Sequence, residues 1–123
     1  MTQKIPRICV VGSANMDLLS KVTRIPKTGE TLVGHYFYMG CGGKGSNQAA
    51  MAAKLGAEVT IVAKLGRDSL GQIILNNYED LGIETSYVSW DDKNFSGVAP
   101  ILVDDQGRNI VVVVPGANLA LSP

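Results

Sequence analysis

Short apolar runs alternate along the chain with longer stretches that have helical spacing. The runs 8–11 and 59–63 are continuous and rich in β-branched residues, which is typical of strands buried in a parallel sheet. The stretches 46–55 and 68–81 are each followed by a glycine that can end a helix, and Ser46 can cap the first of them. A Leu-Gly-x-Glu unit leads out of both stretches into a strand. The order strand, helix, strand, helix, strand predicts an α/β sheet with right-handed crossovers.

Two further segments have the sequence pattern of β-hairpins. Each consists of two runs of mixed or apolar residues that flank a turn containing Gly29 or Gly107. The paired runs are 18–25 with 31–38, and 97–103 with 109–114. Together they predict a small antiparallel sheet attached to the α/β body. Pro100 lies inside one of these runs, and because proline has no N–H group it is expected at an edge or outward-facing position.

Composition narrows the class of protein. The 123 residues are 46% hydrophobic, enough for one domain with a core. Lys plus Arg total 11 and Asp plus Glu total 11, without blocks of one sign, so we expect no nucleic-acid or membrane partner. Two cysteines are too few for a disulfide framework, and no signal peptide or membrane-spanning run is recognised. We therefore expect a cytoplasmic protein that recognises a small molecule.

A glycine cluster at 40–45, Gly-Cys-Gly-Gly-Lys-Gly, fits the G-x-G-x-x-G pattern of dinucleotide-binding turns. A dinucleotide-binding fold also needs an acidic residue at the end of the strand that follows the glycines. Here the next predicted strand leads into Lys64. A P-loop is excluded because Gly45 follows Lys44 where Ser or Thr is required. Dinucleotide binding and a glycine turn without a ligand stay as the weaker alternatives. Cys41 is interpreted as a small space-filler, or else as a thiol whose oxidation would perturb the site.

The same cluster suits a polyol next to a phosphate. Glycines let a ligand approach the main chain, and the start of the following helix offers unpaired N–H groups and a positive dipole end. Lys44 adds a cation there, and Asn47 lies in the first turn of the predicted helix. Asn15 and Asp17 follow the first strand at its carboxyl end, where open α/β sheets bind ligands. In an extended chain such an i, i+2 pair shares one side, so both could hold neighbouring hydroxyl groups.

These motifs resemble the ribokinase (PfkB) family of carbohydrate kinases. The segment 42–49, Gly-Gly-Lys-Gly-Ser-Asn-Gln-Ala, followed by Gly56 and Gly66, has the spacing of that family's amino-terminal signature. Further segments that are similar to ribokinases, in the same order, are 12–17, 26–31, 66–68 and 116–118. The resemblance covers nearly the whole chain. It implies an α/β, ribokinase-like three-layer sheet with helices on both faces, together with a small antiparallel β lid.

The resemblance also implies an activity and a substrate site. The parent protein would transfer the γ-phosphoryl group of ATP to a pentose, with D-ribose as the expected sugar and ribose 5-phosphate as the product. Asn15 and Asp17 would hold ring hydroxyls, while Lys44 would stabilise charge in the transition state. The implied substrate-binding residues are Asn15, Asp17, Gly42, Gly43, Lys44, Asn47, Ala99 and Ile101. In this interpretation the hairpins, approximately 17–39 and 96–115, form the lid, through which two subunits make a homodimer.

The second signature of the family, Asp-Thr-x-Gly-Ala-Gly-Asp, which supplies the catalytic base, has no match in the chain. Ser122-Pro123 is a helix N-cap followed by a first-turn proline, so a helix is expected to follow. We therefore expect residues 1–123 to be the amino-terminal part of a single ribokinase-like domain, without its carboxyl-terminal ATP-binding part. ATP, Mg²⁺ and a monovalent cation would bind the parent enzyme and none of them this chain, which alone is not expected to be active. A catalytically inactive sugar-binding or oligomerisation module is the alternative.

Overall fold

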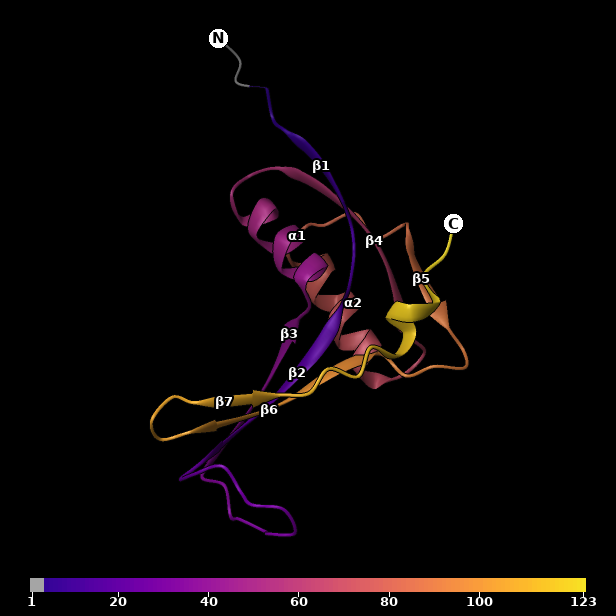
Figure 1. Ribbon diagram of the computed structural model, residues 1–123. Helices are drawn as coiled ribbons and strands as arrows, with labels where there is room; N and C mark the ends of the chain where they lie inside the picture. Colours follow the sequence, from indigo (N-terminus) through magenta and orange to yellow (C-terminus); the bar gives the residue numbers. More distant parts are fainter. Residues whose placement is uncertain (1–3) are drawn as a thin grey trace.

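Two sheets, two α-helices and one 3-10 helix make up the part of the chain that the structure describes (Figure 1). The computed structural model describes residues 4–123, so residues 1–3 of the expected 1–123 unit lie outside the described residues. A parallel sheet has the strand order β1-β4-β5, and a four-stranded sheet has the order β3-β2-β6-β7. The elements are β1 (Arg7–Val11), β2 (Asn15–Val22), β3 (Tyr36–Gly42), α1 (Lys44–Lys54), β4 (Glu58–Gly66), α2 (Ser69–Asp80), β5 (Val88–Asp91), β6 (Gly97–Asp104), β7 (Asn109–Val111) and the 3-10 helix η1 (Gly116–Ala120).

The parallel sheet confirms the predicted order of strands and helices. Every second residue of the central strand β4 is buried in the core: Val59, Ile61, Ala63 and Leu65. Both helices lie on the same face of this sheet, because two successive right-handed crossovers step in the same direction. The hydroxyl of Ser46 in α1 is hydrogen-bonded to that of Tyr78 in α2. Figure 1 shows the two helices together on one side of β4.

The start of α1 differs from the prediction. The helix begins at Lys44 with Gly43 as its N-cap, so Ser46 is not the cap but lies inside the first turn. Gly43 has a φ of 96°, a left-handed conformation that glycine adopts readily, and it leads directly from β3 into the helix. Asp68 caps α2, because its Oδ1 accepts a hydrogen bond from the backbone N–H of Gly71. In the described part of the chain, no helix is long and apolar enough to span a membrane.

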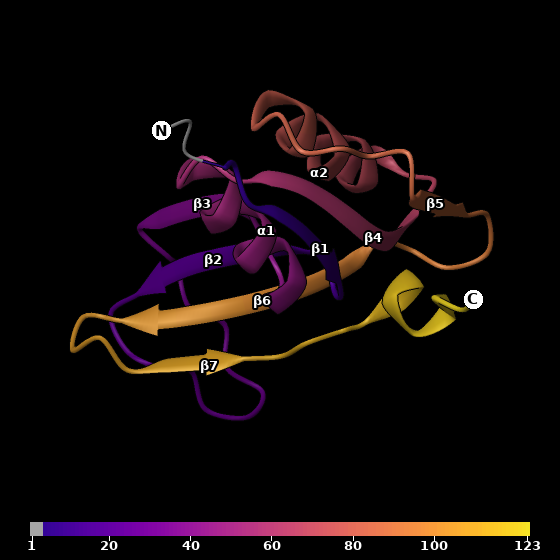
Figure 2. The same cartoon turned by 90° about the horizontal axis from the view of Figure 1, so that it is seen from above.

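The second sheet is built from the two predicted hairpins. β2 pairs antiparallel with β3, and β6 pairs antiparallel with β7, but β2 and β6 are parallel, so the four-stranded sheet is mixed. β3 begins at Tyr36, later than the predicted run 31–38, because residues 23–35 form a long connection. The glycine cluster therefore begins inside β3, not in a loop. Figure 2 shows these four strands side by side, extending beyond the helices.

Pro100 lies in β6, which is a central strand, but its side chain is exposed, so the second of the two expected placements, an outward-facing position, is the one found. Its nitrogen faces the chain just after β7, where the β6–β7 register, continued by one residue, brings Val112 opposite. Val112 N donates to the carbonyl of Pro100 at 3.0 Å, but proline cannot return a hydrogen bond. β7 accordingly ends at Val111, and pairing resumes only at the isolated bridge between Val98 and Val114. Proline is accommodated in the central strand β6 because the neighbouring strand β7 is interrupted opposite it.

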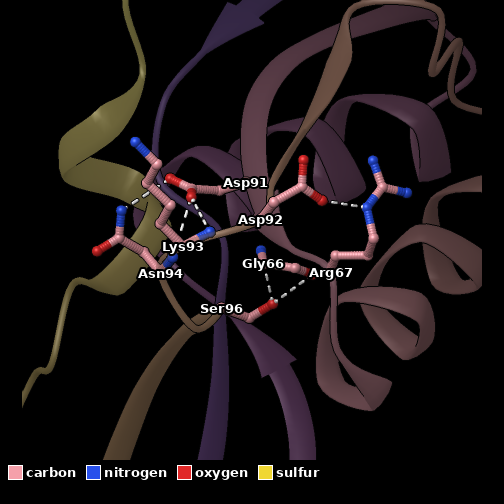
Figure 3. A network of polar contacts seen from close by, with 7 residues as sticks. All are labelled: Gly66, Arg67, Asp91, Asp92, Lys93, Asn94 and Ser96. Carbon is pink, nitrogen blue, oxygen red and sulfur yellow. Dashed lines mark hydrogen bonds and ion pairs between the residues drawn. The ribbon is translucent and has the colours of Figure 1, made fainter.

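A polar network fixes the connection between β5 and β6 (Figure 3). The Asp91 carboxylate accepts hydrogen bonds from the backbone N–H groups of Lys93 and Asn94, and from the side-chain amide of Asn94. The hydroxyl oxygen of Ser96 accepts a hydrogen bond from Gly66 N at 3.0 Å, which ties the end of this connection to β4. These bonds determine where β6 begins, directly beside the start of β2.

Candidate functional site

A pocket of about 390 Å³ lies between the mixed sheet, the first turn of α1 and the segment that leads to η1. Its lining residues are Ser13, Asn15, Asp17, Gly43, Lys44, Asn47, Ala99, Ile101, Val111, Val113, Pro115 and Asn118. Seven of the eight residues predicted to bind substrate are therefore brought together in one place. The eighth, Gly42, lies behind the side chain of Asp17.

The register of the mixed sheet explains why distant residues share this pocket. Asp17 of β2 is paired with Ala99 of β6, and Ile101 of β6 is paired with Val111 of β7. Paired residues of neighbouring strands project from the same face of a sheet, as do alternate residues along one strand. One face of the sheet thus presents a carboxylate at one end and an apolar wall of Ala99, Ile101 and Val111 beside it.

Asp17 provides an acceptor without a partner of its own. Within residues 4–123 its carboxylate receives no hydrogen bond, and partial burial raises the pKa of Asp17 from the usual value of 3.8. A Cβ atom on Gly42 would lie 2.7 Å from Cγ of Asp17, so the carboxylate occupies space that any other residue at 42 would fill. Carboxylate oxygens that face a pocket can accept hydrogen bonds from the hydroxyl groups of a ligand.

Asn118 was not among the predicted site residues, yet it orients one of them. Its Nδ2 donates to Oδ1 of Asn15 at 2.9 Å and to the carbonyl of Ala14 at 3.0 Å, while its Oδ1 accepts from Ala14 N at 2.8 Å. Asn15, which is 8% exposed, is left with its Nδ2 as a donor for a ligand. The signal in the sequence that points to Asn118 is the segment 116–118, Gly-Ala-Asn, which is similar to ribokinases.

The first turn of α1 supplies the cationic end of the pocket. The exposed side chains of Lys44 and Asn47 both reach it. The backbone N–H of Ser46 donates to the carbonyl of Ser13 at 3.0 Å, so it is not one of the unpaired N–H groups expected at the start of the helix. Asn47 N likewise donates to the carbonyl of Gly43. Among the described residues the N–H groups of Lys44 and Gly45 donate no hydrogen bond, so these two amides remain unpaired beside the side chains of the turn.

Cys41 lies outside the pocket. It is paired with Met16 across the β2–β3 ladder, so its side chain projects on the face opposite to Asp17 and packs against the hydrophobic core. Burial raises the pKa of the Cys41 thiol, and the negative charge of Asp17 raises it further. This packing fits the interpretation of Cys41 as a small space-filler.

Comparison with known proteins identifies relatives of the chain. Residues 6–123 match the family model described as pfkB family carbohydrate kinase. The chain is 46% identical over 115 residues to a ribokinase of Mus musculus, covering 94% of this chain and 36% of the relative. It is 44% identical over 116 residues to a deoxyribokinase of Salmonella typhi, covering 94% and 38%. The solved structure of Arabidopsis thaliana ribokinase complexed with ribose and ATP is similar with a TM-score of 0.84 and 36% identity, covering 94% of this chain and 38% of that one.

Proposed function

The chain belongs to the pfkB family of carbohydrate kinases, and from this premise we propose that its pocket binds the pentose of an ATP-dependent sugar kinase. The chain spans between 36% and 38% of the length of the relatives named above, so the activity proposed is that of the whole protein. The product would be a pentose 5-phosphate, with D-ribose as the expected sugar. The observation that carries the proposal is the convergence of seven predicted residues on one pocket.

The pocket has the chemistry that a furanose needs. Asp17 offers acceptors to two neighbouring hydroxyl groups, and Nδ2 of Asn15 offers a donor. Ala99 and Ile101 offer an apolar surface for the face of the sugar ring that carries C–H groups. A small ligand with hydroxyl groups on one side and hydrocarbon on the other would satisfy both halves of the pocket.

Lys44 is the group that we assign to the transferred phosphate. Its exposed ammonium side chain borders the pocket at the N-terminal end of α1. A cation there would stabilise the negative charge that is spread over the phosphoryl oxygens in the transition state. Lys44 would therefore raise the rate as well as the affinity, because the negative charge of the phosphoryl group is distributed differently in the transition state and in the bound substrates.

ATP, Mg²⁺ and a monovalent cation are assigned to the rest of the protein, together with the catalytic base. Among residues 4–123, no group of three or more His, Cys, Asp or Glu side chains is gathered so that it could hold a metal ion. A relative of this family has been solved with ribose and ATP together. Because Lys44 is assigned to the transferred phosphate, the nucleotide would approach the pocket from the side of Lys44.

The two hairpins are proposed to be the lid over the sugar and the contact of a homodimer. They carry both the carboxylate and the apolar wall of the pocket, so a movement of the mixed sheet would open or close it. Their outer strands also bear exposed apolar side chains: Tyr36, Phe37, Tyr38, Met39, Ile110 and Val111. Exposed apolar surfaces of this kind favour association with another protein surface. Sedimentation of the full-length protein tests the dimer.

The test of the function is a screen for ATP-dependent phosphorylation by the full-length protein, using D-ribose, 2-deoxy-D-ribose, D-xylose and L-arabinose. We expect turnover with ribose, with deoxyribose or with both, since the relatives include kinases named for each. A catalytically inactive sugar-binding module is the second candidate, because Asn15, Asp17 and Lys44 line one pocket within the described residues. It would show sugar binding by calorimetry and no turnover, whereas neither binding nor turnover with any pentose would refute both candidates.

A further inference from the structure

A pair of buried hydroxyl groups lies behind the wall of the pocket. Ser46 of α1 is 4% exposed and Tyr78 of α2 is 0% exposed, and their hydroxyl oxygens are hydrogen-bonded to each other. Neither side chain lines the pocket. Buried polar groups are costly unless they are satisfied, so this pair joins the two helices at a specific point.

The direction of the hydrogen bonds follows from the number of available hydrogens. Oγ of Ser46 also lies 3.4 Å from the carbonyl oxygen of Ser13, which can only accept. When the single hydrogen of the Ser46 hydroxyl goes to Ser13, the hydrogen between the two hydroxyls must come from Tyr78. Burial raises the pKa of Tyr78 to about 12, so its phenol keeps this hydrogen at neutral pH. The relay runs from Tyr78 to Ser46 and from Ser46 to Ser13.

The carbonyl of Ser13 is a point on which both sides of the pocket depend. It accepts a second hydrogen bond, from the backbone N–H of Ser46 at 3.0 Å. It also lies against the backbone of Gly43, where a Cβ atom would come within 2.7 Å of it. Ser13 and Gly43 both line the pocket. A displacement of this carbonyl would therefore move the segment before β2 and the first turn of α1 together.

We propose that Tyr78 and Ser46 are positioning residues, which hold the Ser13 carbonyl and the first turn of α1 so that Lys44 and Asn47 face the sugar correctly. The kinetic part of this inference rests on the proposed function. Through the relay, the packing of α2 sets the shape of a pocket that α2 itself does not reach. Small misplacements of positioning groups are enough to reduce catalysis.

The experiment uses three variants of the full-length protein: Tyr78→Phe, Ser46→Ala and the double variant. We expect Tyr78→Phe to raise the sugar KM about fivefold to tenfold at a temperature well below Tm, with the KM for ATP unchanged. Ser46→Ala should also lower Tm, because it leaves the Tyr78 hydroxyl buried without a partner. The double variant removes both hydroxyls, so its Tm should recover while its sugar KM stays high. A purely structural pair would instead restore the KM together with the Tm.

Hydrogen exchange gives a second reading that does not need catalysis. In Tyr78→Phe, peptides that cover 12–18 and 43–48 should exchange faster than in the wild type, and the other peptides should be unchanged. Tyr87→Phe is the matched control, because the Tyr87 side chain is 63% exposed and takes no part in the relay. If no pentose is phosphorylated, the proposed function fails, but the exchange pattern still decides the positioning role. Wild-type exchange in both segments of Tyr78→Phe overturns the inference.

Discussion

The side-chain amide of Asn118 donates a hydrogen bond of 2.9 Å to Oδ1 of Asn15, although the two residues are 103 positions apart. The same side chain brackets the backbone of Ala14, donating to its carbonyl and accepting from its N–H group. Asn118 belongs to η1, so these bonds fasten the last segment of the chain onto the start of β2. The orientation of the Asn15 amide, and thus the donor it presents to the pocket, is set by this contact.

Replacing Asn118 by Ala tests that role. The Ala14 N–H group would lose its acceptor, which costs about 1–3 kcal/mol of the unfolding free energy when the group is buried. The freed amide of Asn15 would rotate, so the sugar KM should rise as well. Urea unfolding and steady-state kinetics measure the two effects. Asn76→Ala, at an exposed position on α2, is the matched control. An unchanged KM in Asn118→Ala would restrict Asn118 to a role in stability.

Replacing Asp17 by Asn should separate binding from stability. Losing a charged acceptor weakens a hydrogen bond by about 1.5–3 kcal/mol, so the sugar KM should rise about 10-fold to 100-fold. Stability should not fall, because burial raises the pKa of Asp17 in the folded protein. A carboxyl whose folded pKa lies above its unfolded pKa destabilises the folded state at neutral pH, and this cost disappears as the pH falls through the raised pKa. A lowered Tm would contradict this account, and Asp80→Asn, at the exposed end of α2, is the control.

Asp91 makes the stability of the folded protein depend on pH with the opposite sign. Hydrogen bonds from the Asn94 side chain, and from the N–H groups of Asn94 and Lys93, lower the pKa of Asp91 to about 2. The stability that this carboxylate contributes is present above its unfolded pKa and is lost as the pH falls towards 2. The urea midpoint should therefore drop less between pH 5 and pH 2.5 in Asp91→Asn than in the wild type. If the urea midpoints of the two proteins fell in parallel with pH, the hydrogen bonds of Asp91 in Figure 3 would not contribute a pH-dependent stability.

Local patterns in the sequence predicted the parts of the fold that local physics determines. The strands β1 and β4 follow from continuous β-branched runs, and the helices follow from spacing and terminal glycines. The spacing of Asn15 and Asp17 was enough to place both on one side of an extended segment, and the structure puts them in one pocket. Their binding roles stay predictions.

The parts that the sequence did not predict depend on contacts between distant segments. α1 begins at Lys44, after Gly43, whose backbone passes close to the carbonyl of Ser13, and no local pattern reveals this contact. Asn118 acquires its role only when η1 reaches β2. Pro100 was expected at an edge or outward-facing position. It is outward-facing, but in a central strand, and the interruption of the neighbouring strand that accommodates its missing N–H group was not predicted.

Pro100→Val should lengthen β7. Valine restores an N–H group that can donate to the carbonyl of Val112, with which position 100 is in register. Hydrogen exchange of the segment 109–114 should slow. The unfolding free energy should change by less than about 1 kcal/mol, because a new hydrogen bond is offset by the greater entropy of the unfolded chain. Pro26→Val, in the long connection between β2 and β3, controls for that entropy. Equal exchange in both variants would mean that proline is not what interrupts β7.

Gly42→Ala tests whether the glycine acts through Asp17. Gly42 does not line the pocket, but its new methyl group would overlap the Asp17 carboxylate and displace it. The sugar KM should rise, while Tm changes little, since a side chain can move where a backbone cannot. A double-mutant cycle with Asp17→Asn gives the mechanism, because two changes that act on the same hydrogen bond are not additive. We expect the double variant to have nearly the KM of Asp17→Asn alone. Fully additive effects would instead mean that Gly42 shapes the pocket independently of Asp17.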